Sequence, residues 1–184
     1  MDLNKLIRDR RTIQIFTNEI VSDNDVKEAL ELSLWAPNHR LTFPWFYMIV
    51  DQARREKLAN LSIELKSKKT PDGRLTDAVK ASMRTAFLNP SHYVALGLKK
   101  NSDPAIDKEN FATLACSVQL ASLVLWEKGI GSKWTTSGFS MSPKTYEILG
   151  ISMEEIRLEG GLMIGKFAKV PPVVPRPSID KIIR

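Results

Sequence analysis

Two adjacent arginines and a threonine near the start of the chain have the chemistry of a phosphate-binding group. Arg10, Arg11 and Thr12 follow residues 3–8, whose apolar side chains fall on one face of a short helix. Guanidinium groups bind oxyanions through paired hydrogen bonds, and a threonine hydroxyl adds a further donor. The same arginines could instead be solvated at a helix end, where the helix dipole favours positive charge. The residue types alone leave both interpretations open.

The segment at residues 36–45, APNHRLTFPW, is bulkier and stiffer than a simple turn requires. It contains two prolines, an arginine, a tryptophan and one of the two histidines of the chain. Connections that only reverse the chain are usually polar and rich in glycine or serine. The segment is therefore a candidate side of a binding site for a flat ligand.

The sequence lacks the motifs of protein-borne nucleophilic, metal or phosphoryl-transfer chemistry. It contains no HExxH, CxxC, GxSxG or P-loop pattern, and we predict no metal site. Glycines in the GIGS sequence at 129–132 allow close backbone approach, but no GxGxxG opens a helix there. The single cysteine, Cys116, is expected to be a packing residue. If the protein is an enzyme, a bound cofactor carries the difficult chemistry.

The bulk composition is that of one ordinary globular domain of 184 residues, with 43% hydrophobic residues. One cysteine excludes an intrachain disulfide, and the N-terminus lacks the apolar core of a signal peptide, so we expect a cytoplasmic protein. The apolar run at 111–126 is shorter than the roughly 20 residues of a membrane span. The net charge of +6 keeps a nucleic-acid-binding domain as an alternative. Because most cations are scattered, we expect neither a nucleic-acid nor a membrane partner.

Hydrophobic periodicity predicts how the chain positions these segments. Ser22 and Asp107 are the predicted N-caps of two helices. A further short helix is predicted to start at Ser142–Pro143 and to end at Gly150. Gly160 and Gly161 inside the last strand indicate a bulge or a close approach to the backbone. The predicted helices are 22–36, 52–69, 76–87 and 107–128, and the predicted strands are 46–50, 92–98 and 158–165.

The helix at 107–128 is apolar on nearly all sides, which indicates either a central position or a contact with a partner chain. After the last strand, the sequence PPVVPRP at 171–177 cannot be helical and predicts an extended tail. Extended tails of this kind often lie on another subunit.

Four segments together resemble the FMN-dependent nitroreductase family. The sequence RRTIQIF at 10–16 is similar to the family pattern Arg-Arg-Ser-x-Arg-x-Phe. The sequence APNHR at 36–40, followed by Pro44 and Trp45, is similar to a short branch with Ala-Pro-Asp/Asn-His-Lys/Arg before Pro-Trp. The third segment is GIGSKWTTSG at 129–138, and the fourth is a glycine-ended strand followed by prolines and Arg176. The four segments follow one another in the family's order over the whole chain.

The resemblance implies an α+β fold in which helices wrap a mostly antiparallel central sheet. It implies a single domain over 1–184 that forms an intertwined homodimer, with residues 167–184 as an extended C-terminal arm that reaches the partner subunit. FMN would lie at the interface of the two chains.

The resemblance also assigns residues to the cofactor. Phosphate and ribityl contacts fall on Arg10, Arg11, Thr12 and Arg176. Gln14 stands where the family often has a basic residue near the pyrimidine edge of the flavin, so it supplies a hydrogen bond but no charge. The remaining positions are Pro37, Asn38 and His39 as one side of the ring site, Trp134, Thr135, Thr136, Ser137 and Gly138 along the ring, and Gly165 and Lys166 nearby.

The implied activity is that of an FMN-dependent NAD(P)H oxidoreductase. NAD(P)H would reduce bound FMN, which would pass electrons to a nitroaromatic, quinone or similar small acceptor by a ping-pong mechanism. No catalytic side chain is required, and His39 is considered both as a proton donor and as a packing group. The alternative is an FMN-binding sensor or storage module with little turnover, for which the neutral Gln14 leaves room.

Overall fold

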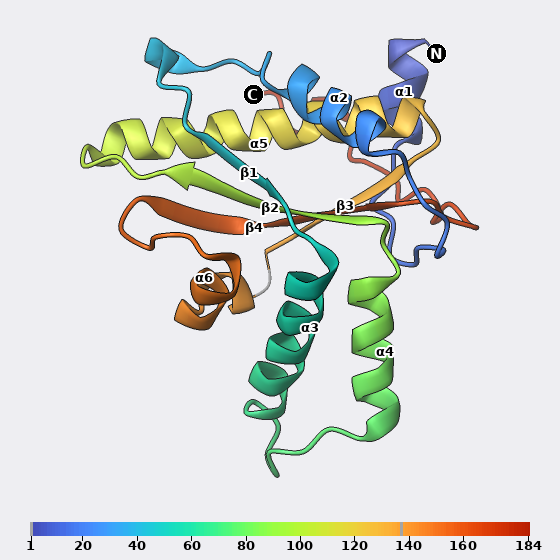
Figure 1. Ribbon diagram of the computed structural model, residues 1–184. Helices are drawn as coiled ribbons and strands as arrows, with labels where there is room; N and C mark the ends of the chain where they lie inside the picture. Colours follow the sequence, from blue (N-terminus) through green and yellow to red (C-terminus); the bar gives the residue numbers. More distant parts are fainter. Residues whose placement is uncertain (1, 137) are drawn as a thin grey trace.

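A four-stranded antiparallel sheet lies between two layers of helices in the computed structural model, which describes residues 2–136 and 138–184 (Figure 1). The strand order is β1-β2-β4-β3. The expected α+β fold with an antiparallel sheet is therefore confirmed. The strands are β1 (Trp45–Ile49), β2 (His92–Lys99), β3 (Gly131–Thr135) and β4 (Ile156–Gly165).

The helices divide between the two faces of the sheet. In Figure 1 the helices α2 and α5 lie above the sheet, with α1 at one end, whereas α3, α4 and α6 lie below it. The first group is α1 (Leu3–Asp9), α2 (Asp23–Ser33) and α5 (Pro104–Glu127). The second group is α3 (Gln52–Ser67), α4 (Asp77–Leu88) and α6 (Pro143–Leu149), and short 3-10 turns are η1 (His39–Leu41), η2 (Gly138–Met141) and η3 (Ile179–Lys181).

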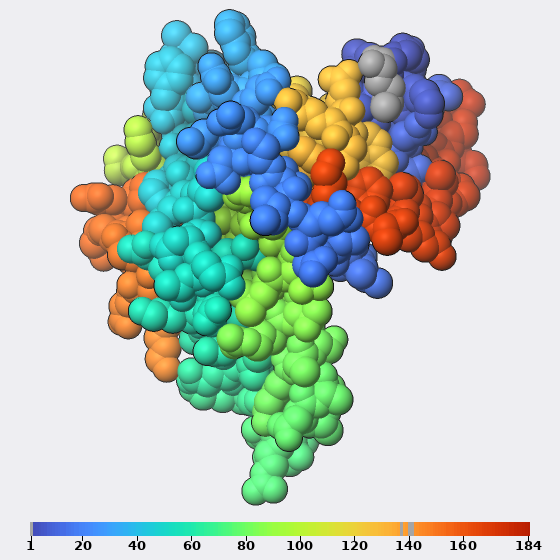
Figure 2. All heavy atoms as spheres, turned by 45° about the vertical axis from the view of Figure 1, so that its right-hand side comes forward, coloured from blue at the N-terminus to red at the C-terminus, as the bar shows by residue number. Residues whose placement is uncertain are grey.

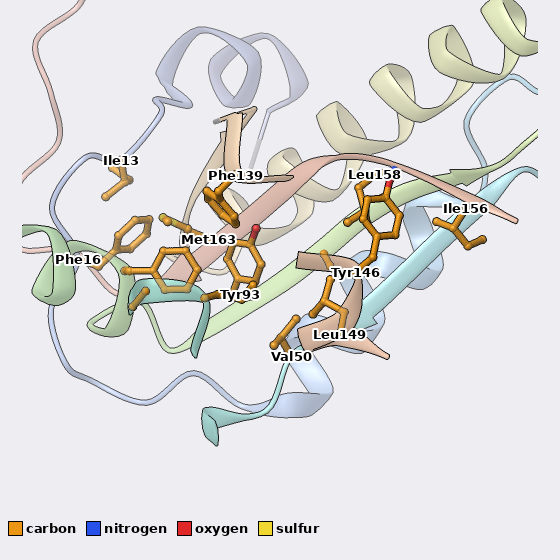
Figure 3. Packing of buried hydrophobic residues seen from close by; sticks show 14 of the residues in the cluster. Ile13, Phe16, Val50, Tyr93, Phe139, Tyr146, Leu149, Ile156, Leu158 and Met163 are labelled. Atoms are coloured by element: carbon orange, nitrogen blue, oxygen red, sulfur yellow. Dashed lines mark hydrogen bonds between the residues drawn. The ribbon is translucent and has the colours of Figure 1, made fainter. Parts of the chain in front are cut away.

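Side-chain alternation along β2 generates two hydrophobic cores. Val94, Leu96 and Leu98 are fully buried and belong to the cluster formed with α2 and α5. Tyr93 and Ala95 point to the other face and belong to the cluster that includes residues of α3, α4 and α6 (Figure 3). The sheet is thus covered on both faces, which explains why β2 has no polar alternation in the sequence.

The start of α5 differs from the prediction. The N-cap is Asp103, whose carboxylate accepts a hydrogen bond from the Ala105 amide at 2.8 Å, and Pro104 occupies the first turn. Proline suits that position because its fixed φ is helical and it lacks an N–H that would need a partner. Asp107 instead lies inside the helix and forms an ion pair with Arg157. The prediction of Asp107 as the N-cap was therefore wrong by one turn.

The glycine pair in β4 has the predicted consequence. Leu96 is opposite Gly160 but Gly97 is opposite Leu158, so one extra residue in β4 forms a bulge. A methyl group at Gly161 would overlap the ring of Tyr93. The prediction of a bulge and of a close approach to the backbone is confirmed.

The chain after β4 is extended and largely exposed. Val173 and Val174 are 71% and 65% exposed before the short turn η3. One face of α5 is also open, because Phe111, Ala112 and Cys116 are exposed. In the described part of the chain, none of the helices has the length and apolarity needed to cross a membrane.

Candidate functional site

Three arginines gather where the N-terminal segment meets the C-terminal tail. Burial lowers the pKa of Arg10, and the positive charges of Arg11 and Arg176 lower this pKa further. The Nε atom of Arg10 is buried without a hydrogen-bond partner. The Nη1 atom of Arg11 donates to the Arg10 carbonyl oxygen at 2.7 Å, and among the described residues none of the three arginines forms an ion pair with a carboxylate. Clustered cations with a free buried donor form a site for an anion.

The segment that carries these arginines runs beside the start of β3. Thr12 forms a parallel bridge with Ser132, and the Ile13 amide donates to the Ser132 carbonyl oxygen at 3.1 Å. Ile13 is completely buried, which anchors the segment to the core. Thr12 and Gln14, on either side of it, are exposed. Gln14 accepts a hydrogen bond from Lys133 on β3, with Nζ and Oε1 2.8 Å apart.

A second group of predicted residues forms the turn before β1. The Oδ1 atom of Asn38 accepts from the Phe43 amide at 2.8 Å, and its Nδ2 atom donates to the Thr42 hydroxyl at 2.9 Å. The carbonyl oxygen of Pro37 accepts from the hydroxyl of Thr113 on α5 at 2.9 Å. The hydroxyl of Thr42 donates to Oδ1 of Asn110, also on α5, at 2.7 Å. Asn38 is thus an organiser of the turn, and α5 holds the turn at both ends.

Three residues of this turn have strained backbone conformations. Arg40, Leu41 and Phe43 have φ values of 58°, 50° and 45°. A left-handed conformation costs a non-glycine residue roughly 1–2 kcal/mol, so the hydrogen bonds of Asn38 and α5 must offset this cost. His39 is exposed, accepts a hydrogen bond from the Arg40 Nε at 3.3 Å and lies 3.9 Å from a carboxylate oxygen of Glu109. Pro37, His39 and Phe43 are exposed, whereas Pro44 is buried.

The other predicted residues lie on or after β3 and β4. Trp134 is half-buried and donates from Nε1 to the Glu159 carbonyl oxygen at 3.1 Å. Gly165 is buried and tightly packed against Phe16, whereas Lys166 donates from Nζ to the Gly129 carbonyl oxygen at 3.3 Å. Thr135 ends β3, Thr136 is exposed and Gly138 begins η2; Ser137 lies outside the described residues.

The structure brings Arg10, Arg11 and Arg176 together but separates them from the turn around Asn38. The turn contacts α5 at Asn110 and Thr113, near the start of the helix. The arginine segment lies at the other end, beside the β3 strand that follows α5 (Figure 1). The helix from Asn110 to Glu127 is roughly 25 Å long at about 1.5 Å per residue. Figure 2 shows the blue N-terminal residues, the gold residues near 130 and the red tail adjoining on one side of the molecule.

The sequence directs attention to the helices between Gln52 and Phe87 for substrate contacts, but it singles out neither Lys133 nor any individual residue of α4. Ser82, Thr85 and Asn89 line a cavity of about 250 Å³ together with Gln14. Their spacing of three and four residues places them on one helix face, which was the available signal. A second cavity, of about 350 Å³, lies between α3, α4 and η2, and its lining includes Leu65, Lys66, Met83 and Phe139.

His92 and Cys116 are two further candidates for side-chain chemistry. His92, the second histidine, is buried and hydrogen-bonded to Asp23 at 2.9 Å. Across the described residues, histidine, cysteine and carboxylate groups do not gather in sets of three that could hold a metal ion. Cys116 is exposed on α5, so the expected packing role is not fulfilled within one chain. The cluster of Arg10, Arg11 and Arg176 is suited to binding an anionic group.

Comparison with known proteins shows that this chain is similar to nitroreductases in both sequence and fold. A model of the nitroreductase family matches residues 7–166. A Bacillus subtilis relative, named "Putative NAD(P)H nitroreductase YfhC", is 25% identical over 178 residues, which cover 96% of this chain and 90% of the relative. A nitroreductase-like family protein from Bacillus cereus has a crystal structure with a TM-score of 0.82 at 24% identity, covering 100% of this chain and 95% of that one. The FMN and NADPH-dependent nitroreductase NfnB from Sphigopyxis sp. strain HMH gives a TM-score of 0.79 at 18% identity, covering 100% and 98% of the two chains.

Proposed function

The chain belongs to the nitroreductase family, and we propose that it is a flavoprotein oxidoreductase that binds FMN between two copies of itself. Bound FMN would accept a hydride from NAD(P)H and pass two electrons to a small organic acceptor of the nitroaromatic or quinone type. Release of the oxidised nucleotide before the acceptor binds makes the mechanism ping-pong. The single cysteine is compatible with the reducing cytoplasm, which we propose as its location.

The arginine cluster is the observation that carries this proposal. Arg10, Arg11 and Arg176 repel one another, and no carboxylate among the described residues offsets that repulsion. The phosphate of FMN would accept hydrogen bonds from these guanidinium groups and from the Thr12 hydroxyl. It would also give the buried Nε of Arg10 the partner that it lacks.

The course of the backbone from the arginines supports the position of the flavin ring. The extended segment from Arg10 to Ile13 runs in the same direction as β3, toward Trp134 and Thr135. A ligand that holds its phosphate at the arginines and lies along this segment has its ring beside Gln14 and the end of β3. Backbone N–H groups at the end of β3 would then orient the ring, and the side chains of α4 would cover it from water.

The separation of the two predicted groups supports a site made by two chains. Pro37, Asn38 and His39 lie roughly a helix length from Arg10 in the same protomer, so one protomer cannot place both groups on one flavin. A second copy packed against the open face of α5 would bring its own turn to the arginine segment. Residues 167–184, with exposed Val173 and Val174, supply an arm for the same contact.

The cavity between α3, α4 and η2 is the proposed acceptor site. Its apolar residues Leu65, Met83 and Phe139 suit an aromatic ring, and it reaches Gly138 at the end of the flavin-facing segment. Lys66 at its rim would favour acceptors with a negative group.

The test is an absorption spectrum of the purified protein with FMN, followed by anaerobic stopped-flow mixing with NADH and NADPH. We expect a bound-flavin spectrum that one of the nucleotides bleaches, and an acceptor that restores it. A protein that takes up no FMN would refute the proposal. Bound FMN that neither nucleotide reduces would instead support the sensor or storage function.

A further inference from the structure

Lys133 is a cation held by a neutral partner inside the proposed site. Its Nζ donates to Oε1 of Gln14 at 2.8 Å, and among the described residues it forms no ion pair. The two residues lie 119 positions apart in the sequence, so the contact depends on the fold. Lys133 itself is half-buried.

The position of Lys133 differs from that of the arginine cluster. Gln14 follows Arg10 by four residues along a segment that is extended up to Ile13. At about 3.3 Å per residue, this places the amide of Gln14 on the order of 10 Å from the arginines. A ribityl chain spans a comparable distance between the phosphate and the ring of FMN. Lys133 therefore lies at the ring end of the site, and the arginines lie at the phosphate end.

Gln14 borders two cavities. The cavity beside α4 contains hydrogen-bonding groups but no charge, whereas the cavity beside the chain after β4 includes Lys169 in its lining. The described residues that line the cavity beside α4 include Ser82, Thr85 and Asn89, and none of its lining residues is ionisable. Among the described side chains that hydrogen-bond to Gln14 or line the cavity beside α4, Lys133 alone carries a positive charge.

We propose that Lys133, positioned by Gln14, faces the pyrimidine edge of the flavin and stabilises the negative charge that the ring carries after reduction. A hydride brings two electrons and one proton to a neutral oxidised ring, so the reduced ring is an anion. A nearby cation binds the anion more tightly than the neutral ring and raises the reduction potential. Lys133 on β3 therefore supplies the positive charge that the neutral Gln14 lacks. The inference rests on the proposed function, because it requires bound FMN.

Redox titration of the FMN-loaded, full-length protein tests this role. In Lys133→Met, the affinity for oxidised FMN should change by less than about threefold, whereas reduced FMN should bind on the order of 10–100 times more weakly. For a two-electron couple this is a fall of about 30–60 mV in midpoint potential, at roughly 30 mV per tenfold. Lys133→Arg should keep the native potential, and Gln14→Leu should lower it by releasing the lysine. Lys99→Met, which removes a cation at the far end of the sheet, is the matched control.

The outcomes separate the two proposals. If Lys133→Met binds FMN at the native potential, the role of Lys133 is refuted while the FMN site stands. If Lys133→Met and Lys99→Met lower the potential equally, the effect is one of net charge, and the role is again refuted. If the native protein takes up no FMN, the proposed function fails and the inference fails with it.

Discussion

Replacing Arg10 by methionine should weaken FMN binding without destabilising the protein that lacks FMN. Methionine keeps an apolar stem of similar length but removes the charge and the buried Nε donor. Without FMN, Arg10 is disfavoured by burial and by the charges of Arg11 and Arg176, which together lower its pKa. Its removal therefore relieves an unfavourable arrangement in the free protein and deletes a favourable one in the complex.

The magnitude follows from the kind of bond that is lost. A hydrogen bond to a charged group contributes about 1.5–3 kcal/mol. At about 1.4 kcal/mol per tenfold, the dissociation constant of FMN should rise roughly 10- to 150-fold. The thermal midpoint of the FMN-free protein should stay the same or rise, because no intramolecular ion pair among the described residues is broken.

Two measurements check this prediction. Fluorescence titration gives the FMN affinity, and thermal unfolding of the FMN-free protein gives the stability. Arg8→Met is the matched control, since Arg8 is an exposed arginine of the preceding helix. An Arg10→Met protein with native FMN affinity and a lowered midpoint would show that Arg10 is structural, and the phosphate assignment would be wrong.

Three further predictions concern stability and assembly. Gly161→Ala should lower the unfolding free energy by about 2 kcal/mol or more, because the added methyl group overlaps the Tyr93 ring. The control Gly150→Ala has open space around a φ of 70° and should lower the unfolding free energy by about 1 kcal/mol. Equal losses of stability in the two variants, measured by thermal unfolding, would contradict the overlap. The hydrogen bond and charge of His92 lower the pKa of Asp23. The Asp23 carboxylate therefore stabilises the fold above its ordinary pKa of about 4, and this stabilisation is lost as the pH falls through the lowered pKa of the folded state. Asp23→Asn should therefore reduce the loss of stability in acid, measured by urea unfolding from pH 6 to 2, and an unchanged acid profile would exclude this contribution. Dilution that converts the FMN-loaded dimer to monomers should release flavin, as followed by light scattering and flavin fluorescence, and a stable FMN-loaded monomer would refute the shared site.

Local sequence was sufficient to predict most of the elements. Ser22 caps α2 through its side chain, which accepts from the Asn24 amide at 3.2 Å, and Gly150 ends α6 with a left-handed φ of 70°. The β-rich runs became β1, β2 and β4, and Gly160 and Gly161 marked the bulge. These features depend on neighbouring residues, so they can be derived from propensity, periodicity and capping. The strand β3 was not predicted because Ser132 and Lys133 give it a polar character and it is stabilised by pairing with β4.

The site itself was only partly determined by the sequence. The types of Arg10, Arg11 and Thr12 indicated an anion, and their motif indicated FMN through the family resemblance. The resemblance also grouped Arg176 with these residues, and the structure places it close enough to affect Arg10. Only the tertiary structure joined Lys133 to Gln14 and set the turn around Asn38 at the other end of α5. Those contacts join residues that are distant in the sequence. Local chemistry fixes which group each residue offers, but the packing of the sheet and α5 decides which groups meet.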